Sequence, residues 1–190
     1  GDTKESETMT LVATAVGKVP KKRILLRSGA KPGDIVVLTG DLGRAGWASR
    51  ALVNPEQRPQ AADLLLRISP RVEEGIFFSE SGVVTSSMDI SDGLGSTIHQ
   101  IAEAGKVAFV LDYDAIPLYK GLAGESRRTI EDLALYYGGD YELVVTVNPD
   151  ALGALLEKYR QAKGKEEVYK LTVIGKVEAK FFSPPRSAVV

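Results

Sequence analysis

The sequence contains no cysteine among its 190 residues, which excludes disulfide bridges, thiolate metal sites and a cysteine nucleophile. No run of residues is apolar over the length of a membrane span, and the first residues lack the pattern of a signal peptide. Neither sign of charge is in excess, since 24 Lys and Arg stand against 25 Asp and Glu. Binding to nucleic acid or to an anionic membrane is therefore not indicated. These absences agree with a cytoplasmic protein that has neither kind of partner.

The length fits one ordinary domain, or one domain plus part of another, and allows a sizeable core. The chain begins Gly1-Asp2-Thr3 without a methionine and enters a strand-like segment, Met9–Val16, almost at once. We therefore expect that residues N-terminal to Gly1 are missing from this sequence. The polar turn Gly17–Arg23, which contains a proline, is a plausible domain boundary.

Apolar runs and amphipathic segments alternate along the rest of the chain. Apolar runs predict strands over residues 35–39, 83–90, 107–111, 144–147 and 171–177. Helical spacing predicts helices over about 47–53, 56–68, 71–78, 94–105 and 151–159, with another helix ending over 131–137. The pattern indicates an α/β (α+β) fold in which helices pack on a mixed sheet.

The most informative polar motif, the aspartate corner (Asp89–Leu94), lies where a predicted strand turns into a helix. A helix N-terminus attracts anions through its free N–H groups and its dipole, but Asp89 and Asp92 would repel a phosphate. A divalent cation would remove this conflict, because Mg²⁺ is typically held by one or two carboxylates together with phosphate oxygens. Alternatively, Ser91 or Asp92 only caps the helix and Asp89 is a favourable first-turn charge. The residues alone leave both interpretations open.

Other polar or aromatic features have simpler explanations. Gly40–Gly46 could cradle a phosphate, but the spacing is neither a Walker loop nor a dinucleotide fingerprint, so a tight turn is expected. His99, the single histidine, is expected to be structural or solvated. For Tyr136, Tyr137 and Tyr141, which surround a glycine pair, we expect core packing rather than stacking on a substrate.

Five separated motifs occur in the order seen in thiamine-monophosphate kinases: Gly1–Thr3, Arg27–Asp34, Asp89–Leu94, Gly138–Leu143 and Ile174–Val177. The sequence thus resembles this family of the aminoimidazole ribonucleotide synthetase-like superfamily from Gly1 to about Val177. The resemblance implies that an N-terminal domain with further metal-binding aspartates precedes Gly1. Residues 1–19 would contain the last strand of that domain, and residues 20–190 would form the C-terminal α/β domain of the superfamily fold.

The activity implied by the resemblance is direct in-line transfer of the ATP γ-phosphoryl group to thiamine monophosphate, giving thiamine diphosphate and ADP. Such transfer needs positioning and charge neutralisation, so no catalytic side chain is expected beyond metal-bound aspartates. By the same resemblance, Asp2, Asp89 and Asp92 are expected to bind Mg²⁺. The expected contacts of ATP are Gly1, Asp2, Arg27 and Ser91.

The motifs also depart from the family pattern. Gly139 stands where many members have a glutamate of the substrate pocket, so Gly139 and Asp140 are only candidate contacts for thiamine monophosphate. The family's aromatic motif near the C-terminus is not recognisable in Phe181–Pro184, and no thiamine-stacking role is transferred to it. The resemblance also implies a homodimer for the full-length protein, and a site that this chain alone would only half build, leaving it inactive.

Two alternatives remain open from the sequence. One is another ATP-using activity of the superfamily, although the absence of cysteine argues against selenium or hydrogenase-maturation chemistry, and the aspartate corner argues against the purine enzyme. The other is a nucleotide-binding or dimerisation module without catalysis.

Overall fold

A computed structural model describes residues 8–10, 12–163 and 170–180 of the chain. Its centre is a curled sheet in which the strand order is β2-β4-β1-β5-β3. The strands are β1 (Ile35–Thr39), β2 (Val84–Asp89), β3 (Val107–Leu111), β4 (Leu143–Val147) and β5 (Leu171–Ala179). All four strand pairings are antiparallel among the described residues, so the expected α/β class is confirmed but the sheet is not mixed. The expectation of a mixed sheet was wrong because helices can cover both faces of an antiparallel sheet as well.

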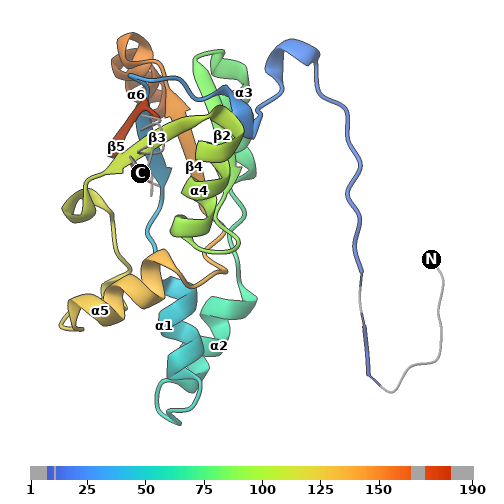
Figure 1. Cartoon of the computed structure of the whole chain (residues 1–190). Helices are drawn as coiled ribbons and strands as arrows, with labels where there is room; N and C mark the ends of the chain where they lie inside the picture. Colours follow the sequence, from blue (N-terminus) through green and yellow to red (C-terminus); the bar gives the residue numbers. More distant parts are fainter. Residues whose placement is uncertain (1–7, 11, 164–169, 181–190) are drawn as a thin grey trace, which may run out of the picture.

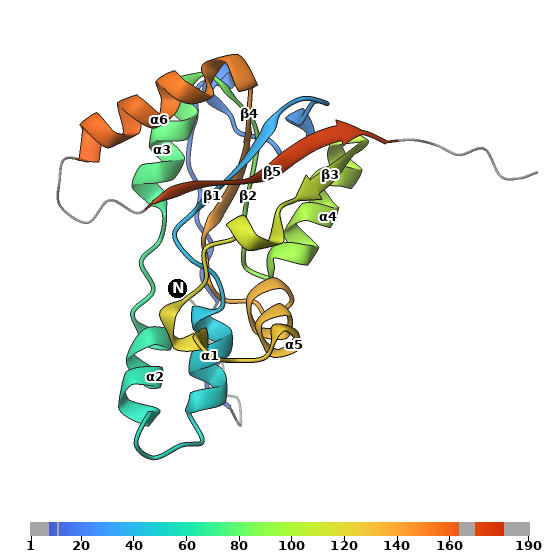
Figure 2. The same ribbon diagram turned by 90° about the vertical axis from the view of Figure 1, so that its left-hand side faces the viewer.

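Helices cover both faces of the sheet and one of its ends. Figure 2 shows α3 and α6 on one face, α4 on the other, and α1, α2 and α5 grouped below the sheet. Their bounds are α1 (Arg44–Ala51), α2 (Arg58–Leu66), α3 (Val72–Ser81), α4 (Leu94–Gly105), α5 (Arg127–Ile130) and α6 (Pro149–Lys163). A π-helical turn, η5 (Glu131–Leu135), continues α5 where the sequence predicted the end of a helix.

Alternation along the strands divides the core into two layers. In β1, Val36 and Leu38 point to the face covered by α4, whereas Val37 points to the face covered by α3 and α6. Phe78 of α3 and Leu155 of α6 are buried in this second layer. Most of the sheet is thus buried on both faces, although Val173 of β5 and Val110 of β3 are 40% and 46% exposed.

A β-bulge interrupts the pairing of β2 with β4. Val84 is opposite Val147 and Ser86 is opposite Thr146, so Thr85 is the extra residue between them. The hydroxyl oxygens of Thr85 and Ser86 both lie 2.6 Å from Thr146 Oγ1. After the bulge the pairing is regular up to its last residue pair in the sheet, Asp89 with Leu143.

Segments before β1 lie along β2 or away from the sheet. Residues 12–20, which include most of the segment expected as a strand over residues 9–16, have no strand pairing and extend away from the rest of the molecule (Figure 1). The 3₁₀ turns η1 (Lys21–Arg23) and η2 (Arg27–Gly29) follow. Between them, Leu26 O accepts a hydrogen bond from Ser87 N at 3.0 Å, which covers part of the outer edge of β2. Gly1 and Asp2 lie outside the described residues.

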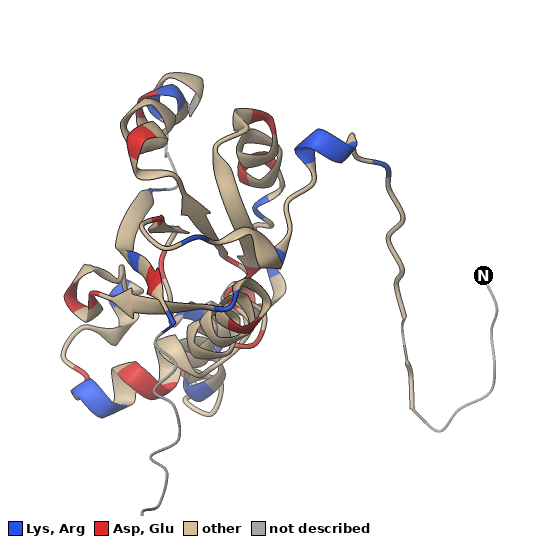
Figure 3. Ribbon diagram, turned by 45° about the horizontal axis from the view of Figure 1, so that its top comes forward, with Lys and Arg blue, Asp and Glu red and all other residues tan. Residues whose placement is uncertain are grey.

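Charges are mixed over the surface of the molecule. Figure 3 shows acidic and basic positions interspersed along the helices, with η1 as a short basic turn. This agrees with the balanced composition of the whole sequence. Across the part of the chain that the structure describes, no helix has the length and apolar character needed to cross a lipid bilayer.

Candidate functional site

The aspartate corner packs directly against the GGDYEL segment (Gly138–Leu143). Three backbone hydrogen bonds join them: Ile90 N to Glu142 O at 2.7 Å, Tyr141 N to Ile90 O at 2.9 Å, and Gly139 N to Ser91 O at 2.9 Å. The structure therefore brings together two of the motifs that the sequence separates. These bonds continue the pairing of β2 with β4 beyond its last residue pair, so they fix the corner to the GGDYEL segment.

Close backbone contact requires glycine on both sides of this junction. A Cβ atom on Gly138 would lie 2.2 Å from Ser91 O, and one on Gly93 would lie 2.8 Å from Leu135 O. Gly93 also has a φ of 87°, which L-residues with side chains rarely adopt. Gly138 thus lets the GGDYEL segment approach the corner closely, and Gly93 lets the corner approach the end of η5.

The carboxylates of Asp89 and Asp92 are exposed at this corner. Neither accepts a hydrogen bond or forms an ion pair with a described residue. The N-cap of α4 is Gly93, and no side chain caps the helix, so the interpretation of Ser91 or Asp92 as an N-cap is not supported. Carboxylate oxygens left without partners beside a helix N-terminus fit the donor set that Mg²⁺ takes with phosphates.

A complete metal cluster is not formed by these side chains alone. Among residues 8–10, 12–163 and 170–180, no group of three or more His, Asp or Glu side chains could hold a metal ion. Asp2, the third expected ligand, lies outside the described residues. Asp89 and Asp92 can therefore supply only part of a coordination sphere.

Arg27 lies on the edge of the sheet that ends at the aspartate corner. Its neighbour Leu26 is hydrogen-bonded to Ser87, two residues before Asp89. The exposed guanidinium donates from one nitrogen to Gln100 Oε1 of α4 at 2.9 Å. The structure thus places Arg27 in η2, beside the edge strand β2 that carries Asp89, with its guanidinium exposed to solvent.

Asp140 has a structural role, unlike the exposed aspartates of the corner. Its side chain is buried, and its two oxygens accept hydrogen bonds from Gly43 N at 2.7 Å and Ala45 N at 2.8 Å, at the start of α1. Burial raises the pKa of Asp140, while the bonds from Ala45 and Gly43 act in the opposite direction. With both oxygens occupied, Asp140 gains no support from this geometry as a contact of the substrate.

The same contacts explain the glycine-rich turn after β1. Residues 40–46 present backbone N–H groups at the N-terminus of α1, as an anion-binding loop would. A carboxylate of the chain itself, Asp140, takes that position. This agrees with the expected tight turn, and it fixes the GGDYEL segment to α1. Gly139, the other substrate candidate, has a φ of 100° and lies over Ala45.

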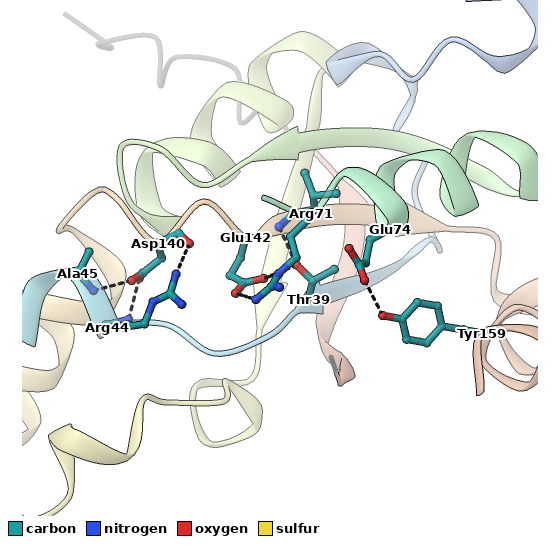
Figure 4. Close-up of polar contacts among 10 residues, drawn as sticks. Thr39, Arg44, Ala45, Arg71, Glu74, Asp140, Glu142 and Tyr159 are labelled. Carbon is teal, nitrogen blue, oxygen red and sulfur yellow. Dashed lines mark hydrogen bonds and ion pairs between the residues drawn. The ribbon is translucent and has the colours of Figure 1, made fainter. Parts of the chain in front are cut away.

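A buried ion pair that the sequence did not indicate fixes the other end of the segment. Arg71, the N-cap of α3, donates from Nε and Nη2 to the two carboxylate oxygens of Glu142 at 2.6 and 2.5 Å. Thr39 Oγ1 donates to Glu142 Oε2 at 2.6 Å and accepts from Leu143 N at 2.8 Å. Figure 4 shows these residues in one row with Asp140. A charged residue directly before an apolar strand could have indicated a buried partner for Glu142, but no local pattern identified Arg71 as that partner.

A second buried polar contact joins α3 to α6. Tyr159 of α6 donates its hydroxyl to Glu74 Oε1 at 3.1 Å, and both side chains are buried (Figure 4). Burial raises the pKa of Tyr159 well above its usual range, with a further contribution from the nearby charge of Glu74. This pair fastens α6 to α3 but does not contact the aspartate corner.

An open pocket of about 280 Å³ lies next to the corner on the α3 face of the sheet. It is lined by Ile68, Pro70, Arg71, Val72, Asp89, Tyr141 and Leu143. Its wall is mostly apolar apart from Arg71 and Asp89. The tyrosines near the glycine pair do not pack in the core as expected, because Tyr136, Tyr137 and Tyr141 are 69%, 41% and 42% exposed.

Comparison with known proteins gives consistent results. Residues 31–182 match the family model described as AIR synthase related protein, C-terminal domain. The thiamine-monophosphate kinase of Pyrococcus horikoshii is 34% identical over 181 residues, covering 94% of this chain and 52% of that protein. The chain thus spans about half the length of the curated relatives that it matches.

Solved structures show the same fold. The thiamine-monophosphate kinase of Stenotrophomonas maltophilia K279a superposes with a TM-score of 0.73 and 28% identity, over 85% of this chain and 52% of that chain. AaThiL complexed with AMPPCP and TMP gives a TM-score of 0.63 with 23% identity, over 82% of this chain and 48% of that chain.

Proposed function

This chain belongs to the AIR synthase related proteins, since it contains their C-terminal domain, and we propose that it is part of an ATP-dependent thiamine-monophosphate kinase. The reaction would transfer the γ-phosphoryl group of ATP to the phosphate of thiamine monophosphate, giving ADP and thiamine diphosphate. The relatives that cover most of this chain have that activity in their names. Within the chain, the observation that supports the proposal best is the pair of exposed carboxylates at the aspartate corner, which have no partner among the described residues.

The proposed roles of the side chains follow from the charge of the reactants. Asp89 and Asp92 would hold Mg²⁺, which when bound would neutralise phosphate charge. Arg27, whose planar guanidinium suits two phosphate oxygens at once, would contact ATP on the same edge of the sheet. Ser91 would contact ATP from inside the corner. Gly1 and Asp2 keep their expected roles towards ATP and Mg²⁺ as part of this proposal.

No nucleophilic side chain is needed in this scheme. An oxygen of the substrate phosphate attacks the γ-phosphorus while the bond from that phosphorus to the bridging oxygen of ADP breaks, so the protein only positions and neutralises. Gly139 would meet the substrate through its backbone, since it has no side chain to offer.

The proposal also includes the cellular location, the oligomeric state and the domain boundary. A cytoplasmic location would supply the ATP that the reaction consumes. The homodimer and the domain boundary near residue 20 come from the family resemblance. The irregular path of residues 12–20 outside the sheet supports the boundary.

An assay of the full-length protein with ATP, Mg²⁺ and thiamine monophosphate tests the proposal. We expect thiamine diphosphate and ADP in equal amounts. Asp89→Asn and Asp92→Asn should each lower the rate by roughly 10²-fold or more, because a preorganised electrostatic contact is lost. Both variants should unfold at the wild-type temperature, since these exposed carboxylates have no partner among the described residues.

Asp132→Asn is the matched control, because Asp132 is an exposed aspartate outside the corner. It should leave the rate unchanged. Wild-type activity in either corner variant would refute the assignment of metal ligands, and a wild-type protein that makes no thiamine diphosphate would refute the proposed function.

A further inference from the structure

Tyr141 has a backbone conformation that its place in the fold does not explain. Its φ is 53°, and the only other described non-glycine residue with a positive φ is Lys106, at 55°. Lys106 is the C-cap of α4, a position where the left-handed conformation is common. Tyr141 instead lies just before a strand, where an aromatic residue in this conformation costs free energy.

Two buried neighbours hold Tyr141 in this conformation. Asp140 is 2% exposed and fixed to the start of α1, and Glu142 is 1% exposed and fixed to Arg71 and Thr39. In addition, the N–H of Tyr141 donates to Ile90 O inside the corner. The strained residue is therefore constrained from both sides. Such constraint around a strained residue is typical of functional sites.

The conformation places the tyrosine at the pocket beside the corner. Tyr141 lines the pocket together with Asp89, Ile68 and Val72. Its side chain remains 42% exposed, so burial of the ring is not the reason for its place. Asp89 belongs both to the pocket and to the proposed phosphate site, so a ligand whose phosphates lie at the corner could extend into the pocket.

We propose that Tyr141 binds the planar heteroaromatic ring of a phosphorylated ligand, with the apolar side chains of the pocket packing around that ring. This inference rests on the proposed function, in which both ATP and thiamine monophosphate carry such a ring. At about 280 Å³ the pocket lies just below the range of roughly 300–1,000 Å³ for whole-ligand sites, which suits one ring better than an entire nucleotide. Stacking on an aromatic side chain changes Kd by roughly tenfold.

Calorimetry on the full-length protein tests this assignment with three ligands, each in the presence of Mg²⁺. ADP and thiamine monophosphate carry a ring, whereas tripolyphosphate carries none. Tyr141→Asn removes the aromatic ring but tolerates the left-handed conformation, so the protein should remain folded. We expect it to weaken binding of one ring ligand roughly tenfold and to leave tripolyphosphate unchanged. Tyr141→Phe should bind all three ligands as the wild type does.

Lys106→Asn is the matched control, since it makes the same change at the other positive-φ position. It should alter no Kd. Tyr141→Gly is a second variant without a ring, for use if Tyr141→Asn fails to fold, because glycine also tolerates a positive φ. The ring ligand whose Kd rises identifies the occupant of the pocket.

The outcomes separate this inference from the proposed function. If the folded Tyr141 variants bind both ring ligands normally, or lose tripolyphosphate equally, the ring assignment is wrong even when the wild type makes thiamine diphosphate. If the wild type makes no thiamine diphosphate while loss of the tyrosine ring weakens ADP alone, the ring assignment is supported and the proposed function fails.

Discussion

Glu142 combines several of the buried contacts near the aspartate corner. Its carboxylate is held by Arg71 and Thr39, and its carbonyl accepts the N–H of Ile90. Removing one charge of a buried pair leaves the other uncompensated. We therefore predict that Glu142→Gln lowers the free energy of unfolding by roughly 3–5 kcal/mol, measured by urea denaturation.

The matched control is an exposed ion pair. Arg67 and Asp63 lie 2.6 Å apart on the surface, and Asp63→Asn should cost less than about 1 kcal/mol. The double variant Arg71→Met/Glu142→Leu should be less damaging than Glu142→Gln, because it removes both charges of this pair rather than one. A Glu142→Gln variant as stable as the wild type would contradict the prediction.

For single residues, the sequence predicted the position correctly where the local pattern around the residue defines it. Asp89 and Asp92 could be placed at a strand-to-helix corner because local periodicity defines both elements. The partnership of Arg71 with Glu142 could not, because the two residues are distant in the chain and no local pattern links them. Tyr141 was expected in the core, but the buried acidic residues on either side of it turn its ring towards solvent.

Among the elements, the contact between the aspartate corner and the GGDYEL segment depends most on small residues. Gly138→Ala would put a Cβ atom 2.2 Å from Ser91 O, so the two segments must separate. We predict a loss of about 1–3 kcal/mol in stability. Displacement of the corner should also lower the kinase rate by roughly 10²-fold. Urea denaturation and the kinase assay measure these two effects.

Gly153→Ala provides the comparison within α6. A Cβ atom there would meet nothing within 4 Å, and alanine is favoured over glycine inside a helix. This variant should gain about 0.5–1 kcal/mol and keep the wild-type rate. If Gly138→Ala behaved in the same way, the close contact would not be needed for activity.

The elements themselves were largely predictable, while their pairing was not. Residues 35–39 were predicted as a strand and form β1, and the helix after the corner ends at Gly105 as expected. The direction of pairing depends on partners elsewhere in the chain, and the expected mixed sheet proved antiparallel. The alternating pattern of residues 9–16 has no strand partner in the described structure, so it forms no strand there.

For the whole molecule, the proposal predicts that this chain alone holds an incomplete site. Asp89 and Asp92 can supply part of a coordination sphere, and the chain spans about half the length of its curated relatives. We therefore expect the 190-residue chain to bind ATP with Mg²⁺ at least roughly tenfold more weakly than the full-length protein, by calorimetry. Equal affinities would show that these residues build the ATP site without help.

The bulge at Thr85 also determines on which face of the sheet Asp89 lies. Side chains alternate between the two faces of a strand, so one additional residue exchanges odd and even positions beyond it. Val84 faces α3 and α6 while Met88 faces α4, although an uninterrupted strand would put both on one face. Asp89, next to Met88, therefore emerges on the α3 face beside the pocket. The bulge thus decides on which side of the sheet Asp89 emerges, and deletion of Thr85 would reverse that side.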